Sequence, residues 1–389
     1  MTTTEITENA LSEEDRAAIV AAVRDFAEAE LAPNAIAWDR EHHFPVDVLA
    51  EAGQLGLGGI YVREDVGGAG LGRREAVEIF EQLARGDTSI AAYVSIHNMV
   101  AWMIDTYGTP VQREQWLPRL TTMEDLGSYC LTEPDAGSDA ANLRTSARRE
   151  GEEWVLNGVK QFISGAGSSS VYIVMARSGG PGSGGISAFI VPKDAPGLGF
   201  GANEVKMGWN AQPTRQVILD GVRIPASNLL GDTEGRGFSI AMNGLNGGRL
   251  NIAACSLGGA QWAVDQAAAY LATRHAFGGP LSNQQGAVFM LADAQIDLQA
   301  ARAVLADAAS RLDRKTKDAP VMAAGAKRFV TDAAFAAANT ALQLHGGYGY
   351  LAEYGIEKVV RDLRVHQILE GSNEIMKLIV GRTLVGASA

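Results

Sequence analysis

The chain has 389 residues, of which 47% are hydrophobic and 20% charged, as in an ordinary globular protein of two or three domains. Its net charge of −12 at pH 7 argues against nucleic acid as a partner, because no basic block is present to neutralise phosphates. The two cysteines, Cys130 and Cys255, fit neither a metal site nor a disulfide framework, and we expect buried thiols in a reducing compartment.

The N-terminus, MTTTEITENALSEED, is acidic and polar, without the apolar core of a signal peptide or the arginines of a transit peptide. No apolar run approaches transmembrane length. We therefore expect a cytoplasmic protein, or a protein of the mitochondrial matrix only if a presequence has been removed.

Residues 1–125 are expected to form an N-terminal α-helical domain. Ser12 and Asp15 have the spacing of a helix cap, and apolar residues then recur at helical spacing up to residue 31. The stretch YVREDVGGAGLG follows no phosphate-loop pattern, and we interpret its glycines as turns. Four further helices are predicted: Val46–Leu55, Arg73–Leu83, Ile90–Tyr107 and Val111–Thr121.

Residues 126–235 are predicted to form a small antiparallel β domain, because short strand-like runs alternate with turn signals. We interpret the stretch SGGPGSGG as a flexible hairpin tip. The predicted strands include Trp154–Leu156, Val171–Ala176, Ala188–Val191 and Gln216–Ile224.

Residues 236–389 are again helical and rich in alanine, which permits the close helix packing of a bundle. The overall prediction is an α+β protein with a helical domain, a β domain and a helical bundle in that order. The long helices are expected at Cys255–His275, Gly286–Arg314 and Val321–Leu344.

The helical pattern is broken in the stretch VHQILEGSNEIM, next to a carboxylate. Gly371 is a poor helix residue and Ser372 is a natural N-cap, so we expect one helix to end with Val365–Leu369 and the next to include Glu374–Val380. Glu370 then lies at the junction, beside a glycine that leaves room for a ligand. From this stretch alone, Glu370 can be a surface residue, a helix cap or a catalytic base.

Four other polar or glycine-rich segments have an ordinary structural interpretation as well as a functional one. YCLTEPDAGSDAANLRT can be a polar loop, and the Phe of KQFISGAG can be a core residue. Arg249, which follows two glycines, can form a surface salt bridge or approach a ligand. His345 of LQLHGGYGYLAEY is favoured as a structural histidine, since no metal-ligand partner accompanies it.

Taken together with TRHAFGGPLSNQQG, these segments make the chain resemble the acyl-CoA dehydrogenase family over roughly residues 10–385. YCLTEPDAGSDAANLRT and the pair HGGYGY and ILEGSNEIM are its most specific signatures. The resemblance implies a helical domain, a β-barrel-like middle domain and a four-helix bundle, with FAD bound between the last two. It also implies a homotetramer that passes electrons to electron-transfer flavoprotein, without a metal, nucleic acid or membrane insertion.

The resemblance assigns roles to individual residues. Glu370 would be the catalytic base, and the backbone N–H of Ser372 would polarise the thioester carbonyl with a flavin hydroxyl. FAD would be bound by Cys130, Leu131, Thr132, Ser138, Phe162, Ser164, Ser372, Asn373 and Glu374, and, across a subunit interface, by Arg274, Phe277, Asn283, Gln284, Gln343, Gly346 and Gly347. The acyl-CoA would be bound by Ser138, Asn246, Arg249, Leu369, Gly371 and Arg382.

Two residues refine this assignment. One branch of the family carries its base immediately before the helix arginine, where this chain has Gly248, which has no side chain. Leu369 stands where straight-chain members more often have tyrosine, and the C-terminal third resembles the branch that acts on isobutyryl-CoA in valine breakdown. A short straight-chain or 2-methylbutyryl-CoA dehydrogenase, an acyl-CoA oxidase and a non-catalytic scaffold of the same fold remain as alternatives.

Overall fold

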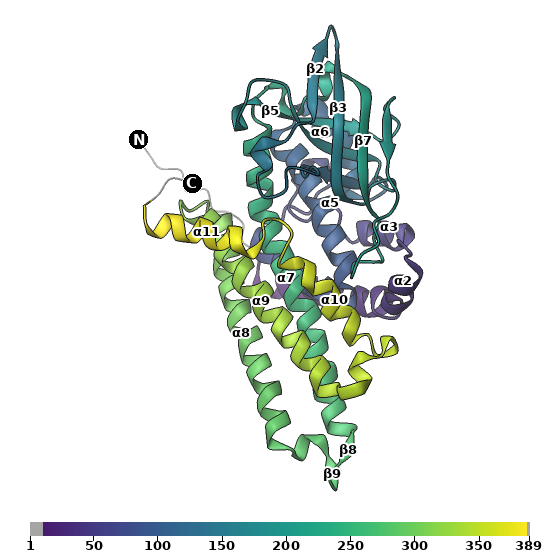
Figure 1. Cartoon of the computed structure of the whole chain (residues 1–389), viewed down its shortest axis with the longest axis vertical. Coiled ribbons are helices and arrows are strands. Elements are labelled where there is room, and N and C mark those ends of the chain that lie inside the picture. The colour runs from purple at the N-terminus through teal and green to yellow at the C-terminus, as the bar shows by residue number, and fades with distance from the viewer. Residues whose placement is uncertain (1–10, 387–389) are drawn as a thin grey trace.

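The computed structural model describes residues 11–386, which form two helical regions with a β-sheet between them in sequence (Figure 1). The acidic N-terminal stretch that bears on targeting lies largely outside the described residues. Within residues 11–386, none of the helices combines the length and hydropathy needed to span a lipid bilayer. The expected order of helices, strands and helices is confirmed.

The first region is built from capped amphipathic helices. Ser12 accepts a hydrogen bond from the N–H of Asp15, as its spacing predicts, and the helix that it starts continues into a π-helical turn at Ala27–Leu31. The helices are α1 Glu13–Phe26, α2 Ala35–Glu41, α3 Val46–Gln54, α4 Arg73–Gly86, α5 Thr88–Tyr107 and α6 Pro110–Thr121.

The middle region is a twisted seven-stranded sheet with strand order β1-β4-β2-β3-β7-β6, in which β5 pairs with the other side of β4. Most pairs are antiparallel, as expected, but β1 runs parallel to β4 along its length. The strands are β1 Gly127–Cys130, β2 Ser146–Glu150, β3 Glu153–Ser164, β4 Val171–Arg177, β5 Ile186–Pro192, β6 Leu198–Phe200 and β7 Thr214–Pro225.

The last region contains three long helices and two shorter ones, with a small hairpin at the far end from the sheet (Figure 1). The α7 and α9 helices pack along each other, and α8, α10 and α11 pack against α9. The elements are α7 Gly237–Thr273, β8 His275–Ala276, β9 Gly279–Pro280, α8 Gln285–Asp313, α9 Ala319–His345, α10 Ile356–His366 and α11 Asn373–Leu384.

The α7 helix begins 18 residues before the predicted start at Cys255, because its glycines are packing positions rather than turns. A Cβ on Gly244 would lie 2.3 Å from the Cε of Met103, and one on Gly258 would lie 2.1 Å from the carbonyl oxygen of Glu81. Tertiary packing against α4 and α5 therefore outweighs the low helix propensity of glycine.

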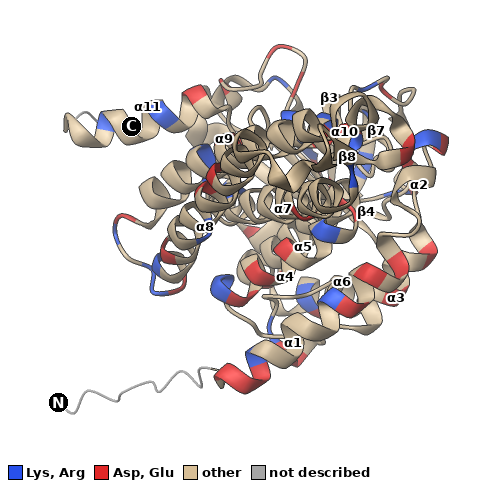
Figure 2. Cartoon of the chain, turned by 90° about the horizontal axis from the view of Figure 1, so that it is seen from below, with Lys and Arg blue, Asp and Glu red and all other residues tan. Residues whose placement is uncertain are grey.

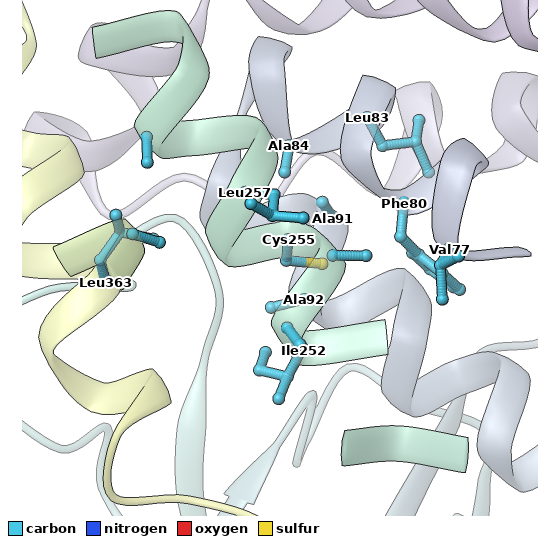
Figure 3. Packing of buried hydrophobic residues seen from close by; sticks show 14 of the residues in the cluster. Val77, Phe80, Leu83, Ala84, Ala91, Ala92, Ile252, Cys255, Leu257 and Leu363 are labelled. Atoms are coloured by element: carbon cyan, nitrogen blue, oxygen red, sulfur yellow. The ribbon is translucent and has the colours of Figure 1, made fainter. Parts of the chain in front are cut away.

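The core between α4, α5, α7 and α10 is close-packed and rich in alanine (Figure 3). Cys255 lies at its centre, and both cysteines are buried free thiols, as predicted. Acidic side chains gather at the exposed start of α1 (Figure 2), and beside the core the buried Lys358 is paired with Asp87 and Asp362.

Candidate functional site

The segment between α10 and α11 turns sharply around Glu370. The α10 helix ends at His366, so the predicted continuation to Leu369 is wrong, whereas Ser372 caps α11 as expected. Glu370 has φ +54° and Gly371 has φ +92°, two consecutive left-handed residues. A glutamate in this region is strained, and such strain is concentrated at functional sites.

The turn leaves backbone donors unused. Leu369 N–H donates to the carbonyl of Val365, and Asn373 N–H donates to that of Gln367. The three N–H groups between them, from Glu370 to Ser372, reach no backbone acceptor within residues 11–386. They can therefore stabilise negative charge on a ligand oxygen.

Glu370 is half-buried, and one oxygen of its carboxylate points into the protein. Its Oε2 is buried and finds no hydrogen-bond partner within residues 11–386. Burial raises the pKa of Glu370 to about 7, against the opposing effect of the positive charges on Lys327 and Arg249. Gly248 provides the room, because a Cβ there would lie 2.5 Å from Oε2.

Arg249 and Asn246, both predicted from the sequence, lie beside this turn on α7. The Nε of Arg249 donates to the carbonyl oxygen of Glu370 at 3.2 Å, and its Nη1 donates to Oδ1 of Asn246 at 3.0 Å. Arg249 is buried and forms no salt bridge within the described residues, so the surface salt-bridge interpretation is wrong.

Several residues near the base carry no sequence signal. Lys327 of α9 donates to the carbonyl oxygen of Gly371, and the buried hydroxyl of Tyr129 has no partner within residues 11–386. Arg73 is buried with its guanidinium 3.5 Å from the ring centroid of Tyr61, whose hydroxyl accepts a hydrogen bond from Asn251. Neither the type of these residues nor their spacing distinguishes them in the sequence.

The sheet brings a second group together. Thr132 accepts a backbone hydrogen bond from Gln161 at 2.8 Å, which places Leu131 and Thr132 beside Phe162. The Phe162 ring is 63% exposed, with φ +59°, so it is not the core residue of the alternative interpretation. Such an exposed aromatic face suits a planar ligand.

Buried charges support that edge of the sheet. Lys160, completely buried, donates to the carbonyl of Leu131 and to Oε1 of Glu133 at 2.7 Å. Burial raises the pKa of the Cys130 thiol to about 12, so Cys130 is a packing residue with an unreactive thiol here. Ser164 is half-buried and Ser138 is exposed on the loop that follows β1.

A third group lies at the end of the bundle, around a pocket of about 410 Å³. Arg274 lies 5.3 Å from the ring centroid of Tyr348, while His345 is held by the carbonyl of Ala341 and stacks on Tyr270, as a structural histidine. The other predicted residues here lie in or beside this region: Phe277, Asn283, Gln284, Gln343, Gly346 and Gly347.

The structure therefore separates the predicted residues into groups. The bundle end with Arg274 lies opposite the sheet with Phe162, so one chain does not bring these together (Figure 1). Asn373 and Glu374 begin α11 next to the base, and Leu369 packs against the core. Arg382 is exposed near the end of α11, away from the turn.

Comparison with protein families covers almost the whole chain. Residues 13–124, 128–222 and 235–385 match, respectively, the N-terminal, middle and C-terminal domains of acyl-CoA dehydrogenase.

Individual proteins agree with this match. The chain is 53% identical over 361 residues to the mitochondrial isobutyryl-CoA dehydrogenase of Bos taurus, covering 93% of this chain and 86% of that protein. Butyryl-CoA dehydrogenase from Megasphaera elsdenii superimposes with a TM-score of 0.93 at 35% identity, covering 96% and 99% of the two chains. A glutaryl-CoA dehydrogenase from Mycobacterium smegmatis, in complex with FADH2, superimposes with a TM-score of 0.92 at 31% identity, covering 99% and 97%.

Proposed function

Because the chain belongs to the FAD-dependent acyl-CoA dehydrogenase family, we propose that it oxidises isobutyryl-CoA to methacrylyl-CoA. The observation that carries the proposal is the Glu370 carboxylate, which has a buried oxygen without a partner, lies beside unused backbone donors and has its pKa raised to about 7. The identity with the bovine isobutyryl-CoA dehydrogenase supports the choice of acyl group.

Glu370 acts as the base that removes the proton from Cα of the acyl thioester. A carboxylate with a pKa near 7 is a stronger base than one in water, yet much of it is ionised at neutral pH. Gly248 keeps the space around its oxygens free, and position 248 offers no second base.

The backbone N–H of Ser372 polarises the thioester carbonyl as negative charge develops on its oxygen. Gly371 allows the necessary turn, because its φ of +92° suits a residue without a Cβ. A Cβ at this position would also lie 2.5 Å from the Cε of Met376. A donor fixed before the reaction begins is worth about 100- to 1,000-fold in rate at comparable sites.

The residues present fit a bound flavin. Phe162 offers an exposed aromatic face beside Thr132 and Ser164, and the pocket near Arg274 offers a cation and a tyrosine for the phosphate and adenosine end. A flavin held by these residues would supply the hydride acceptor for Cβ and the route for electrons to electron-transfer flavoprotein. Since these two groups are far apart in one chain, a neighbouring subunit would complete the flavin site, as in the homotetramer that the family resemblance implies.

Leu369 shapes the acyl pocket next to the base. Its side chain is half-buried against the core, and a leucine occupies less space than a tyrosine ring at this position, which favours a methyl branch at Cα. Discrimination by one methyl group is limited, so we expect a preference for isobutyryl-CoA over butyryl-CoA of about 10- to 200-fold, with 2-methylbutyryl-CoA as the nearest competitor.

Anaerobic titration of the flavin-loaded protein with a panel of acyl-CoAs tests the proposal. Isobutyryl-CoA should bleach the flavin absorbance with the highest kcat/KM, and oxygen uptake during turnover should be slow. A preference for butyryl- or octanoyl-CoA would replace the branched substrate by a straight-chain one. Rapid oxygen consumption would identify an oxidase, and absence of flavin would leave a non-catalytic scaffold.

A further inference from the structure

Lys327 is a completely buried lysine on α9 that forms no salt bridge within the described residues. Its Nζ donates to the carbonyl oxygen of Gly371 at 2.9 Å and to Oδ1 of Asn373 at 2.9 Å. A buried ammonium without a carboxylate against it is costly, so its two neutral acceptors must compensate for lost hydration. Both acceptors belong to the turn that contains the base.

We propose that Lys327 is a positioning residue for the dehydrogenation, holding the Gly371 carbonyl so that the following N–H, of Ser372, is directed at the thioester oxygen. The inference rests on the proposed function and adds to it a residue that makes no contact with the reacting atoms.

The geometry of the peptide unit connects the two groups. No peptide bond in residues 11–386 is cis, and in a trans peptide the carbonyl oxygen and the following N–H point in opposite directions. Because Lys327 holds the Gly371 oxygen on the α9 side, the Ser372 N–H must point away from α9. Arg249 holds the preceding carbonyl, of Glu370, from α7. Cations on two helices thus fix two successive peptide units.

The far end of the turn is fixed on the same face of α9. Asn373 donates from Nδ2 to Oγ1 of Thr331 at 3.0 Å and to Oδ1 of Asp332 at 2.7 Å. Gln367, before the turn, donates to that same aspartate oxygen at 2.7 Å. This rigid support explains how Glu370 remains in a left-handed conformation, which an unsupported glutamate would leave.

The positive charge of Lys327 also affects the pKa of the base. The groups that act on Glu370 are Lys327 from α9 and Arg249 from α7, and both positive charges lower its pKa. Tyr129 of β1, Tyr61 and Cys255 also lie within electrostatic range of the carboxylate, and burial raises the pKa of all three, so they are neutral at pH 7. Removing the lysine should therefore leave the base harder to ionise.

The test compares Lys327→Met with Lys377→Met in the flavin-loaded protein. Lys377 is exposed on α11, so the control makes the same substitution outside the site. We expect Lys327→Met to slow flavin reduction by isobutyryl-CoA about 10- to 100-fold and to move the pH midpoint of that rate upward. The Lys377→Met control should match the parent protein in the rate of flavin reduction and in its pH midpoint.

Infrared spectroscopy of bound methacrylyl-CoA provides a readout other than activity. In the parent, the thioester C=O stretch should lie below that of free methacrylyl-CoA, and Lys327→Met should return it toward the free value. Lys327→Gln, which keeps an N–H donor without the charge, should retain more of the carbonyl shift while still moving the pH midpoint.

The outcomes distinguish failure of the proposed function from failure of the positioning role of Lys327. If the parent flavin is not reduced by acyl-CoA, the proposed function fails. If the parent is reduced but both lysine variants keep its carbonyl frequency and pH midpoint, the positioning role is refuted, even where their thermal stability falls. Should Lys327→Met fail to fold, the glutamine variant decides the question by the same two readouts.

Discussion

Gly248→Ala adds one methyl group at the point where the catalytic carboxylate meets α7. The new Cβ would lie 2.5 Å from Oε2 of Glu370 and 3.0 Å from its Cδ. Alanine is a better helix former than glycine by about 1 kcal/mol, so the substitution should not unfold α7. Its effect is therefore directed at the base.

The size of the displacement follows from the contact. Ordinary van der Waals contact begins at 3.4 Å, so the carboxylate must move by about 0.9 Å, the difference between 3.4 and 2.5 Å. A misplacement of about 1 Å from the reacting geometry costs roughly 100-fold in rate. We expect flavin reduction to slow by about that factor, whereas binding of the CoA portion changes little.

Stopped-flow reduction with isobutyryl-CoA measures this rate directly. Gly325→Ala on α9 is the matched control, because its Cβ would meet only Val380 at an ordinary 3.8 Å. The control should reduce its flavin at the parent rate. Parent-like kinetics in Gly248→Ala would mean that the Glu370 carboxylate is not the base, or that its position is irrelevant to the reaction.

Three further predictions concern pH, assembly and specificity. Because the ionised form of Glu370 is active, kcat/KM should rise with pH through about 7. The contribution of Glu370 to folding stability should fall as pH rises from 4.5, its ordinary pKa, to about 7, its pKa in the folded protein. A rate that does not change between pH 5 and 9 contradicts the assignment. Arg274→Ala should lower flavin content together with the oligomeric state, measured by absorbance and size-exclusion chromatography, and a monomer that keeps one flavin per chain refutes the shared site. Leu369→Tyr should depress turnover of isobutyryl-CoA more than that of butyryl-CoA in steady-state assays, and an equal effect on both removes Leu369 from substrate selection.

Much of the fold could be predicted from local pattern. Helix caps such as Ser12 and Ser372 bond to backbone groups a few residues away, so the local sequence is enough to predict where those helices begin. Helical structure from residue 236 is predicted correctly, but the continuity of α7 before Cys255 could not be recognised, because Gly244 and Gly248 lower helix propensity and the side chains packed against them are not visible in the sequence. The parallel pairing of β1 with β4 depends on long-range contacts that no local pattern specifies.

The site divides in the same way. The Glu-Gly-Ser turn carries an unusual local combination, so Glu370 could be singled out from the sequence. Lys327, Tyr129 and Asn251 could not, because each occupies an ordinary position in a helix or strand. Their relevance arises only when α7, α9 and β1 meet around the carboxylate. The groups that support the base are therefore a property of the tertiary structure.

Glu370→Gln tests the central claim most directly, because it keeps volume and hydrogen-bonding capacity while removing basicity. Flavin content and binding of isobutyryl-CoA should remain as in the parent, and the rate of anaerobic flavin reduction in stopped flow should fall at least about 100-fold. A glutamine variant that reduces its flavin at near the parent rate would show that another group takes the α-proton.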